Sequence, residues 1–148
     1  MRREIVVKAD PARVFDAFTD VGELLSWFAD GAVVGRRTGG NWALGWYAGE
    51  ESDEGYHVLG TIEVYEPGRR LVVRDLRFSS PEGETWEGMS LSVDLAAEDG
   101  GTRVTVVQDG VGEGPSWDGY ATGLGPGWDR SLADLRAWLE EGRKLPGR

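Results

Sequence analysis

The spacing of apolar residues changes twice along the chain, and each change marks a different kind of element. An apolar run at residues 5–7 predicts a short strand. Asp10, which is followed by a proline, predicts a helix start, because aspartate caps a helix and proline suits the first helical position. Asp20 and Glu23 have capping-box spacing and predict a second short helix, which ends at Gly31. The chain is therefore expected to begin with a strand and two short helices.

From about residue 32 to residue 110 the apolar period is two, which is typical of half-buried strands. The clearest alternation sets Met89, Leu91, Val93 and Leu95 against Ser90, Ser92 and Asp94. Further strand-like runs begin near Trp42, Val58, Leu71 and Val104. Turn-forming glycine, proline and aspartate separate these runs, and such short connections join antiparallel neighbours. The middle of the chain is thus predicted to be an antiparallel meander.

Helical spacing returns in the final segment. Trp128, Leu132, Leu135 and Leu139 lie at i, i+4, i+7 and i+11, which places them on one helix face. Upstream, three glycines and Pro126 crowd into residues 123–127 and predict a bend or break before this helix, because both residue types disfavour helix interiors.

A single sheet with one apolar face needs a cover, and the C-terminal helix has the apolar stripe to provide it. The predicted fold is therefore α+β, with a curved antiparallel sheet of about six or seven strands around a long C-terminal helix. Residues 1–148 are expected to form one domain. A bent sheet around one helix leaves space near the helix ends, where a pocket can form.

Composition narrows the possible functions. The 26 acidic and 16 basic residues leave a formal charge of −10, which disfavours nucleic acid as a partner. Cysteine is absent, which excludes thiol chemistry and fits a cytoplasmic protein. The N-terminus lacks the pattern of a secretory signal, and no apolar run is long enough to predict a membrane span.

Recognisable catalytic and metal-binding patterns are missing. His57 is the single histidine, and its parity opposes that of Val58, Ile62 and Val64, so it is expected to point away from the core. One histidine cannot supply a histidine-rich metal site, and we predict no catalytic residue, metal or cofactor. The acidic tract at residues 50–54 lacks the ligand spacing of a calcium loop and is predicted to be a solvated loop.

The run at residues 71–78 contains a conflict. If Leu71 and Val73 face the core, regular alternation also turns Asp75 and Arg77 inward, and the opposite register turns Arg74 inward. A buried charge is costly unless it is paired. Either the charges anchor a ligand headgroup, or the strand reaches the open rim of the sheet, where they meet water.

Aromatic side chains carry the pocket hypothesis. Seven tryptophans are many for this length, and their large apolar faces can fill a core or line a cavity. The residues predicted to line a pocket between sheet and helix are Trp27, Trp42, Trp46, Phe78, Met89, Leu91, Gln108, Tyr120, Leu124 and Trp128. The alternative is that these side chains form an ordinary core.

Several motifs, in order, resemble those of START-like (SRPBCC) domains. The segment ADPARVFDAFTDVGELLSWF at residues 9–28 is similar to their opening. The segments GTIEVYEP at 60–67 and GTRVTV at 101–106, with Gly127 and Trp128, are similar to the branch related to the C-terminal domain of the activator of heat-shock protein 90 ATPase. The resemblance spans about residues 3–140 and implies a helix-grip fold with a cavity. The glycine-rich stretch around Pro126 departs from the family pattern.

The family includes lipid, polyketide and hormone binders, cyclases and chaperone-interacting domains, so it leaves function open. The first hypothesis is non-catalytic binding of a hydrophobic or aromatic small molecule. A protein-interaction module acting on a chaperone is the second, and a cyclase or hydrolase using the same cavity is the third. A homodimer is a further possibility.

Overall fold

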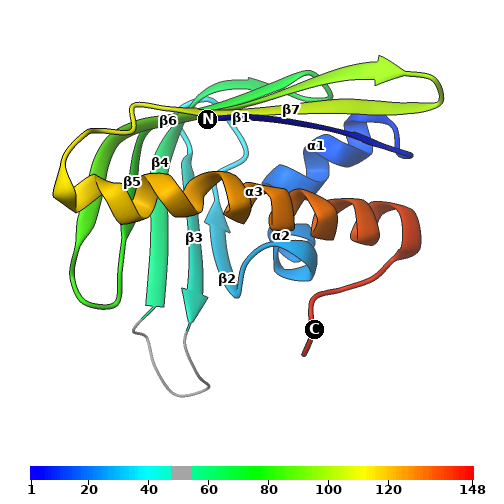
Figure 1. The fold of residues 1–148 in the computed structure, drawn as a ribbon. Coiled ribbons are helices and arrows are strands. Elements are labelled where there is room, and N and C mark those ends of the chain that lie inside the picture. Colours follow the sequence, from blue (N-terminus) through cyan, green and yellow to red (C-terminus); the bar gives the residue numbers. More distant parts are fainter. Residues whose placement is uncertain (48–54) are drawn as a thin grey trace.

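A computed structural model describes residues 1–47 and 55–148, so the acidic tract at 50–54 lies outside the described residues. Within these described residues, seven strands and three helices follow one another (Figure 1). Their bounds are β1 Arg2–Val7, α1 Pro11–Thr19, α2 Val21–Trp27, β2 Gly31–Val34, β3 Asn41–Tyr47, β4 Gly55–Glu66, β5 Arg70–Ser79, β6 Thr85–Glu98, β7 Gly101–Asp109 and α3 Pro115–Glu141.

The strands form one antiparallel sheet in the order β1-β7-β6-β5-β4-β3-β2. Strands β2 to β7 follow the chain as a meander, and β1 adds to the far edge beside β7. Helix α3 crosses one face of the curved sheet, and α1 and α2 lie toward its C-terminal end (Figure 1). This arrangement confirms the predicted helix-grip architecture.

The two short helices begin where the sequence predicts. The Asp10 carboxylate accepts a hydrogen bond from the Arg13 backbone N–H at 2.8 Å, and Asp20 accepts one from the Glu23 N–H at 3.0 Å. Each bond satisfies a backbone donor that the first helical turn leaves unpaired. The apolar face of α1, which includes Val14, Phe15 and Phe18, is buried in the core under the sheet.

A β-bulge resolves the conflict in β5 and corrects the expectation that a charge must face inward. Val73 pairs with Leu91 and Leu76 pairs with Met89, so β5 contains one residue more than β6 between these pairs. Asp75 has a φ of 51°, in the left-handed region, which marks the bulge. The extra residue resets the parity, so Val73 and Leu76 are both buried. The charges of β5 therefore meet water on the outer face.

A second irregularity, between Ile62 and Val64 of β4, corrects another expectation. Ile62 pairs with Val73 in the core, but Val64 pairs with Val72, which shares the outer face. The sequence predicted Val64 on the core face because it assumed an uninterrupted strand.

Replacing Asp75 by glycine is expected to stabilise the protein by about 1 kcal/mol, because glycine adopts a positive φ without the strain that a Cβ brings. The ion pair of Asp75 with Arg74 is largely exposed and contributes little. Asp75→Val is the matched control and should destabilise, since a β-branched residue tolerates this conformation worst. Urea denaturation followed by circular dichroism measures the free energy of unfolding of both variants. Equal stability of the two variants would contradict the argument.

The prediction of a break before the final helix is wrong. Residues Pro115–Glu141 form one helix, with Pro126 inside it. Local propensity disfavours this helix, but packing at both ends favours it. Trp128, Leu132 and Leu135 are buried in the core, and at the other end the Ser116 carbonyl accepts a hydrogen bond from the Trp86 indole at 2.6 Å. Within the described residues, no helix is long and apolar enough to cross a membrane.

Candidate functional site

Five aromatic rings gather between the sheet and the first half of α3, and we call them the aromatic end of the grip: Tyr56, Phe78, Trp86, Trp117 and Tyr120. Tyr120 is central, with ring centroids 5.2 Å from Phe78, 5.4 Å from Trp86 and 5.8 Å from Trp117. Tyr56 stacks on Phe78 at 5.5 Å and is 44% exposed. The cluster therefore reaches from the interior to solvent.

Gln108 of β7 places polar atoms beside these rings. Its side-chain Nε2 donates to the Tyr120 hydroxyl at 2.6 Å and lies 3.4 Å from the Met89 sulfur, while its Oε1 accepts from the Trp128 indole at 3.0 Å. The residue is only 4% exposed. A buried amide is stable only while its donors and acceptors are paired, so these contacts hold the side chain in one orientation.

The Tyr120 hydroxyl stays neutral in this surrounding. Burial raises the pKa of Tyr120 above its ordinary value, and the hydrogen bond from Gln108 offsets part of that increase. The phenol can therefore donate or accept a hydrogen bond near neutral pH, and it is a poor proton source for acid catalysis.

Two of the predicted site tryptophans hold the scaffold together. The Trp27 indole donates to the Ala17 carbonyl at 2.8 Å, and the Trp42 indole donates to the Phe18 carbonyl at 2.9 Å. Both rings are 1% exposed. They tie α2 and β3 to the end of α1, away from the aromatic end of the grip.

The other predicted residues lie between the sheet and α3. Phe28 joins two of them, with its ring centroid 5.2 Å from Trp46 and 5.4 Å from Trp128. Tyr120 contacts both the Phe78 ring and the Gln108 amide. Two further predicted residues, Met89 and Leu91, are buried in the core, and Leu124 is half-buried on α3. Side chains thus occupy much of the space in which the sequence predicted a cavity.

The predicted site omitted Phe28, Tyr56, Trp86 and Trp117, and a bulge in β6 explains the omission of Trp86. Regular alternation from Met89 would turn Trp86 outward. Instead, Phe78 pairs with Trp86 and Leu76 pairs with Met89, so β6 carries one extra residue, near Gly88 with its φ of 79°. The glycine before Met89 was the available signal, because an isolated glycine in a strand marks a bulge.

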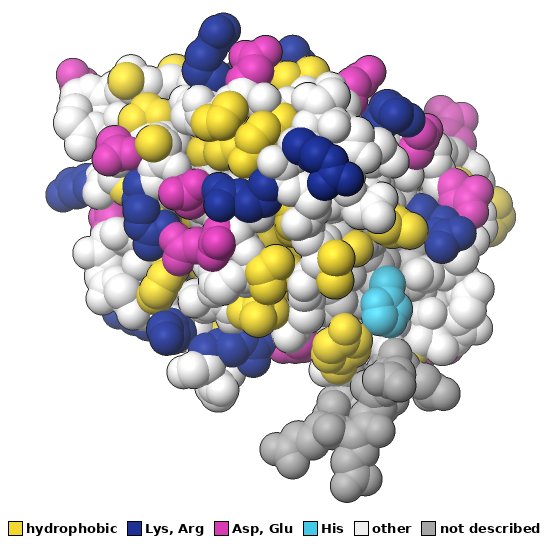
Figure 2. Space-filling model, turned by 180° about the vertical axis from the view of Figure 1, so that it is seen from behind, with side chains coloured by type: hydrophobic (Ala, Val, Ile, Leu, Met, Phe, Trp, Pro, Cys, Tyr) yellow, Lys and Arg dark blue, Asp and Glu magenta, His cyan; other side chains and the backbone are white. Residues whose placement is uncertain are grey.

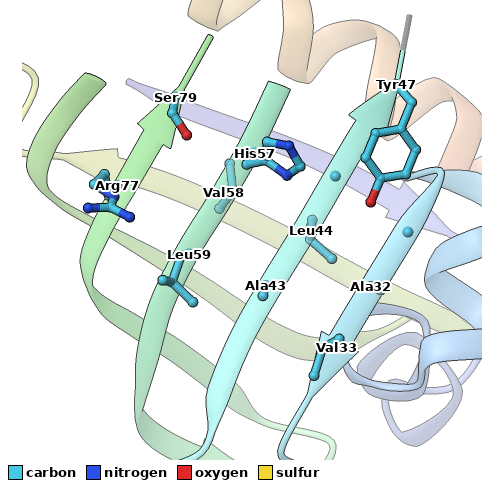
Figure 3. Close-up of a pocket in the computed structure, with 12 residues that line it drawn as sticks. Ala32, Val33, Ala43, Leu44, Tyr47, His57, Val58, Leu59, Arg77 and Ser79 are labelled. Carbon is cyan, nitrogen blue, oxygen red and sulfur yellow. The ribbon is translucent and has the colours of Figure 1, made fainter. Parts of the chain in front are cut away.

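The outer face of the sheet carries a shallow hollow of about 490 Å³ over β2, β3, β4 and β5 (Figure 3). Val33 and Leu59 flank Ala43 across the strands and are 68% and 42% exposed. Gly31 and Gly45 leave room for the Tyr47 ring, whose hydroxyl lies 2.7 Å from where a Cβ would stand on either glycine.

His57 lines this hollow, away from the core as its parity predicts. Figure 2 shows the outer face with apolar side chains beside the single histidine. Arg77 also lines the hollow, and among its described lining residues there is no acidic side chain. In the described part of the chain, no group of three or more histidine, aspartate or glutamate side chains could hold a metal ion.

A curved antiparallel sheet gripping a long C-terminal helix defines a START-like protein of the helix-grip class. The chain belongs to the family of activator of Hsp90 ATPase homolog 1-like proteins, whose family model matches residues 8–140. No curated protein matches the chain in sequence.

Several solved structures share the fold. DynU16, a protein of the dynemicin biosynthetic locus, is 21% identical with a TM-score of 0.75; the match covers 97% of this chain but only 48% of DynU16, so the chain spans about half of that protein. CV1439 from Chromobacterium violaceum is 24% identical over 95% of this chain and 96% of its own, with a TM-score of 0.71. The Aha1 dimer from Colwellia psychrerythraea is 20% identical over 96% of both chains, with a TM-score of 0.70.

Proposed function

We propose that the protein binds a hydrophobic or aromatic small molecule, without catalysis, at the aromatic end of the grip. The hydrogen-bonded Gln108 carries this proposal, because it puts an orienting amide among ring faces that would hold an apolar guest. Ligand sites combine an apolar lining with a few fixed polar groups in this way. Of the three side chains that contact the Gln108 amide, only Tyr120 titrates, and its raised pKa suits binding better than proton transfer.

Binding can be tested with N-phenyl-1-naphthylamine, a neutral aromatic probe that accepts energy from tryptophan. We expect saturable energy transfer, because Trp86 and Trp117 belong to the site. Native mass spectrometry of the protein purified from cells would show whether it retains a guest of its own. A lack of saturable transfer together with a bare protein mass would contradict the proposal.

The outer hollow favours a second candidate function, protein interaction, with another copy of this chain as the partner. Its face presents exposed Val33 and Leu59 beside the small Ala43, so the same patch offers both projections and a recess, as a two-fold contact requires. The described lining includes the basic Arg77 and no acidic residue, so the described residues add no acid–acid repulsion to a two-fold contact. The fold relative from Colwellia psychrerythraea, described as a dimer, supports this choice.

Replacing Leu59 by aspartate is expected to keep the protein monomeric at concentrations where the wild type dimerises, because it puts two carboxylates into the contact. Val6→Asp is the matched control, since Val6 is 38% exposed on β1 at the opposite edge of the sheet. Light scattering after size exclusion measures the mass over a range of protein concentrations. A monomeric wild type throughout that range would refute this second function.

A further inference from the structure

Helix α3 consists of two halves with very different helix-forming tendencies. The first half, residues 115–127, contains glycines at 119, 123, 125 and 127 together with Pro126. Residues 128–141 contain neither residue type. Glycine and proline are the two weakest helix formers, so the first half is intrinsically much less stable than the second.

Packing does not account for two of these glycines. A Cβ added at Gly119 or at Gly123 would meet nothing within 4 Å, and neither residue has a left-handed φ. Gly125 differs, since a Cβ there would collide with the Arg3 guanidinium. Alanine would therefore fit at 119 and 123 and would favour the helix. The weakness of this half has no steric cause at those positions.

Few contacts hold the first half in place. The buried residues of α3 are Gly125, Trp128, Leu132 and Leu135, so the helix buries no residue before position 125. The first half is held by hydrogen bonds from Trp86 to the Ser116 carbonyl and from Gln108 to Tyr120. The partly buried side chains of Trp117, Tyr120 and Leu124 also pack against the core. Segments with little buried surface open locally while the rest of a protein stays folded.

Pro126 marks where the halves can separate. A proline has no N–H, so the Thr122 carbonyl, four residues earlier, lacks its usual helical donor. Gly125 and Gly127 flank Pro126 in the sequence and permit wide changes in the backbone dihedral angles. Immediately after it, Trp128 is anchored to Gln108.

We propose that residues 115–127 open as a unit while residues 128–141 stay docked, and that this opening admits the ligand. The inference rests on the proposed function, since it concerns the same site. In the closed form Tyr120 fills the space against Phe78 and Trp86. Opening moves Trp117, Tyr120 and Leu124 away from the sheet and exposes the Gln108 amide. A guest can then contact the ring faces of Phe78 and Trp86 and form a hydrogen bond with the amide.

Amide hydrogen exchange of the ligand-free protein tests the opening itself. Amides at residues 119–125 are expected to exchange about ten-fold or more faster than those at 132–140. The double variant Gly119→Ala/Gly123→Ala should slow exchange in the first half by roughly 25-fold, at about five-fold for each change, and leave the second half unaltered. Ala121 is exposed, and Ala121→Gly is the opposite control, which should accelerate exchange in the first half about five-fold. Equal exchange rates in both halves would overturn the proposal.

Stopped-flow binding of N-phenyl-1-naphthylamine tests the route. If opening limits entry, the observed binding rate should level off as the probe concentration rises. In the double alanine variant, this limiting binding rate should fall in parallel with the amide exchange rate of the first half. If exchange slows but probe entry does not, the ligand enters elsewhere and the proposed route is wrong. If exchange behaves as expected but no variant binds the probe, the proposed function fails while the opening stands.

Discussion

Replacing Trp27 by alanine is expected to lower the free energy of unfolding by about 3–5 kcal/mol, the range for removing a large buried aromatic side chain. The ring is 1% exposed, it stacks on Phe28 at 4.6 Å, and it meets the edge of Phe18 at 5.2 Å. Its loss would also leave the Ala17 carbonyl without the indole donor. The cost combines a cavity with an unpaired buried acceptor.

Trp86→Ala is the matched control for this change. Trp86 is half-buried and contacts other rings at the aromatic end of the grip, so its removal should cost much less stability but should weaken probe binding. Urea denaturation followed by far-ultraviolet circular dichroism compares the two without relying on tryptophan emission. Equal stability losses would show that the division between scaffold and site tryptophans is wrong.

Replacing Gln108 by leucine is expected to lower the free energy of unfolding by about 1–3 kcal/mol, the cost of leaving buried polar groups unsatisfied. Leucine has a similar size but cannot pair with the Trp128 indole or the Tyr120 hydroxyl, which now contact the amide at 3.0 and 2.6 Å. Probe affinity should also fall about ten-fold, because one hydrogen bond that orients a guest is worth roughly 1.4 kcal/mol.

Tyr120→Phe separates the two contributions of Gln108. It keeps the ring contacts with Phe78 and Trp86 and removes only the hydroxyl, so the bond between Gln108 and Trp128 remains. Its effect on stability should therefore be smaller than that of Gln108→Leu. If Gln108→Leu binds the probe as tightly as the wild type, the proposed function loses the observation that carries it.

The two proposed functions concern opposite faces of one sheet. On the inner face, large rings and one amide fill the space beneath α3. On the outer face, glycine and alanine leave a shallow hollow edged by Val33, Leu59 and Tyr47. We propose a small guest at the first face and a second copy of the chain at the second, and the Gln108 and Leu59 variants test the two proposals independently.

Local chemistry determined the order and type of the elements. Asp10 and Asp20 cap their helices through their own side chains, and alternation in residues 89–95 follows from strand geometry alone. These signals act over a few residues, so they can be seen in the sequence. A sheet covered by the C-terminal helix follows from their order, because one apolar sheet face and one long apolar stripe must cover each other. The resemblance to START-like domains implied that this arrangement is a helix-grip fold.

Only the tertiary structure decided which way β5 and β6 turn their side chains. Bulges at Asp75 and near Gly88 depend on register with the neighbouring strands, and each reverses the parity beyond it. Trp86 therefore reaches the site, and Arg77 leaves it. Long-range packing likewise holds α3 together across Pro126 against its local preference. Whether a tryptophan serves the scaffold or the site depends on which carbonyl or ring it meets across the fold, and that partner lies far away in the sequence.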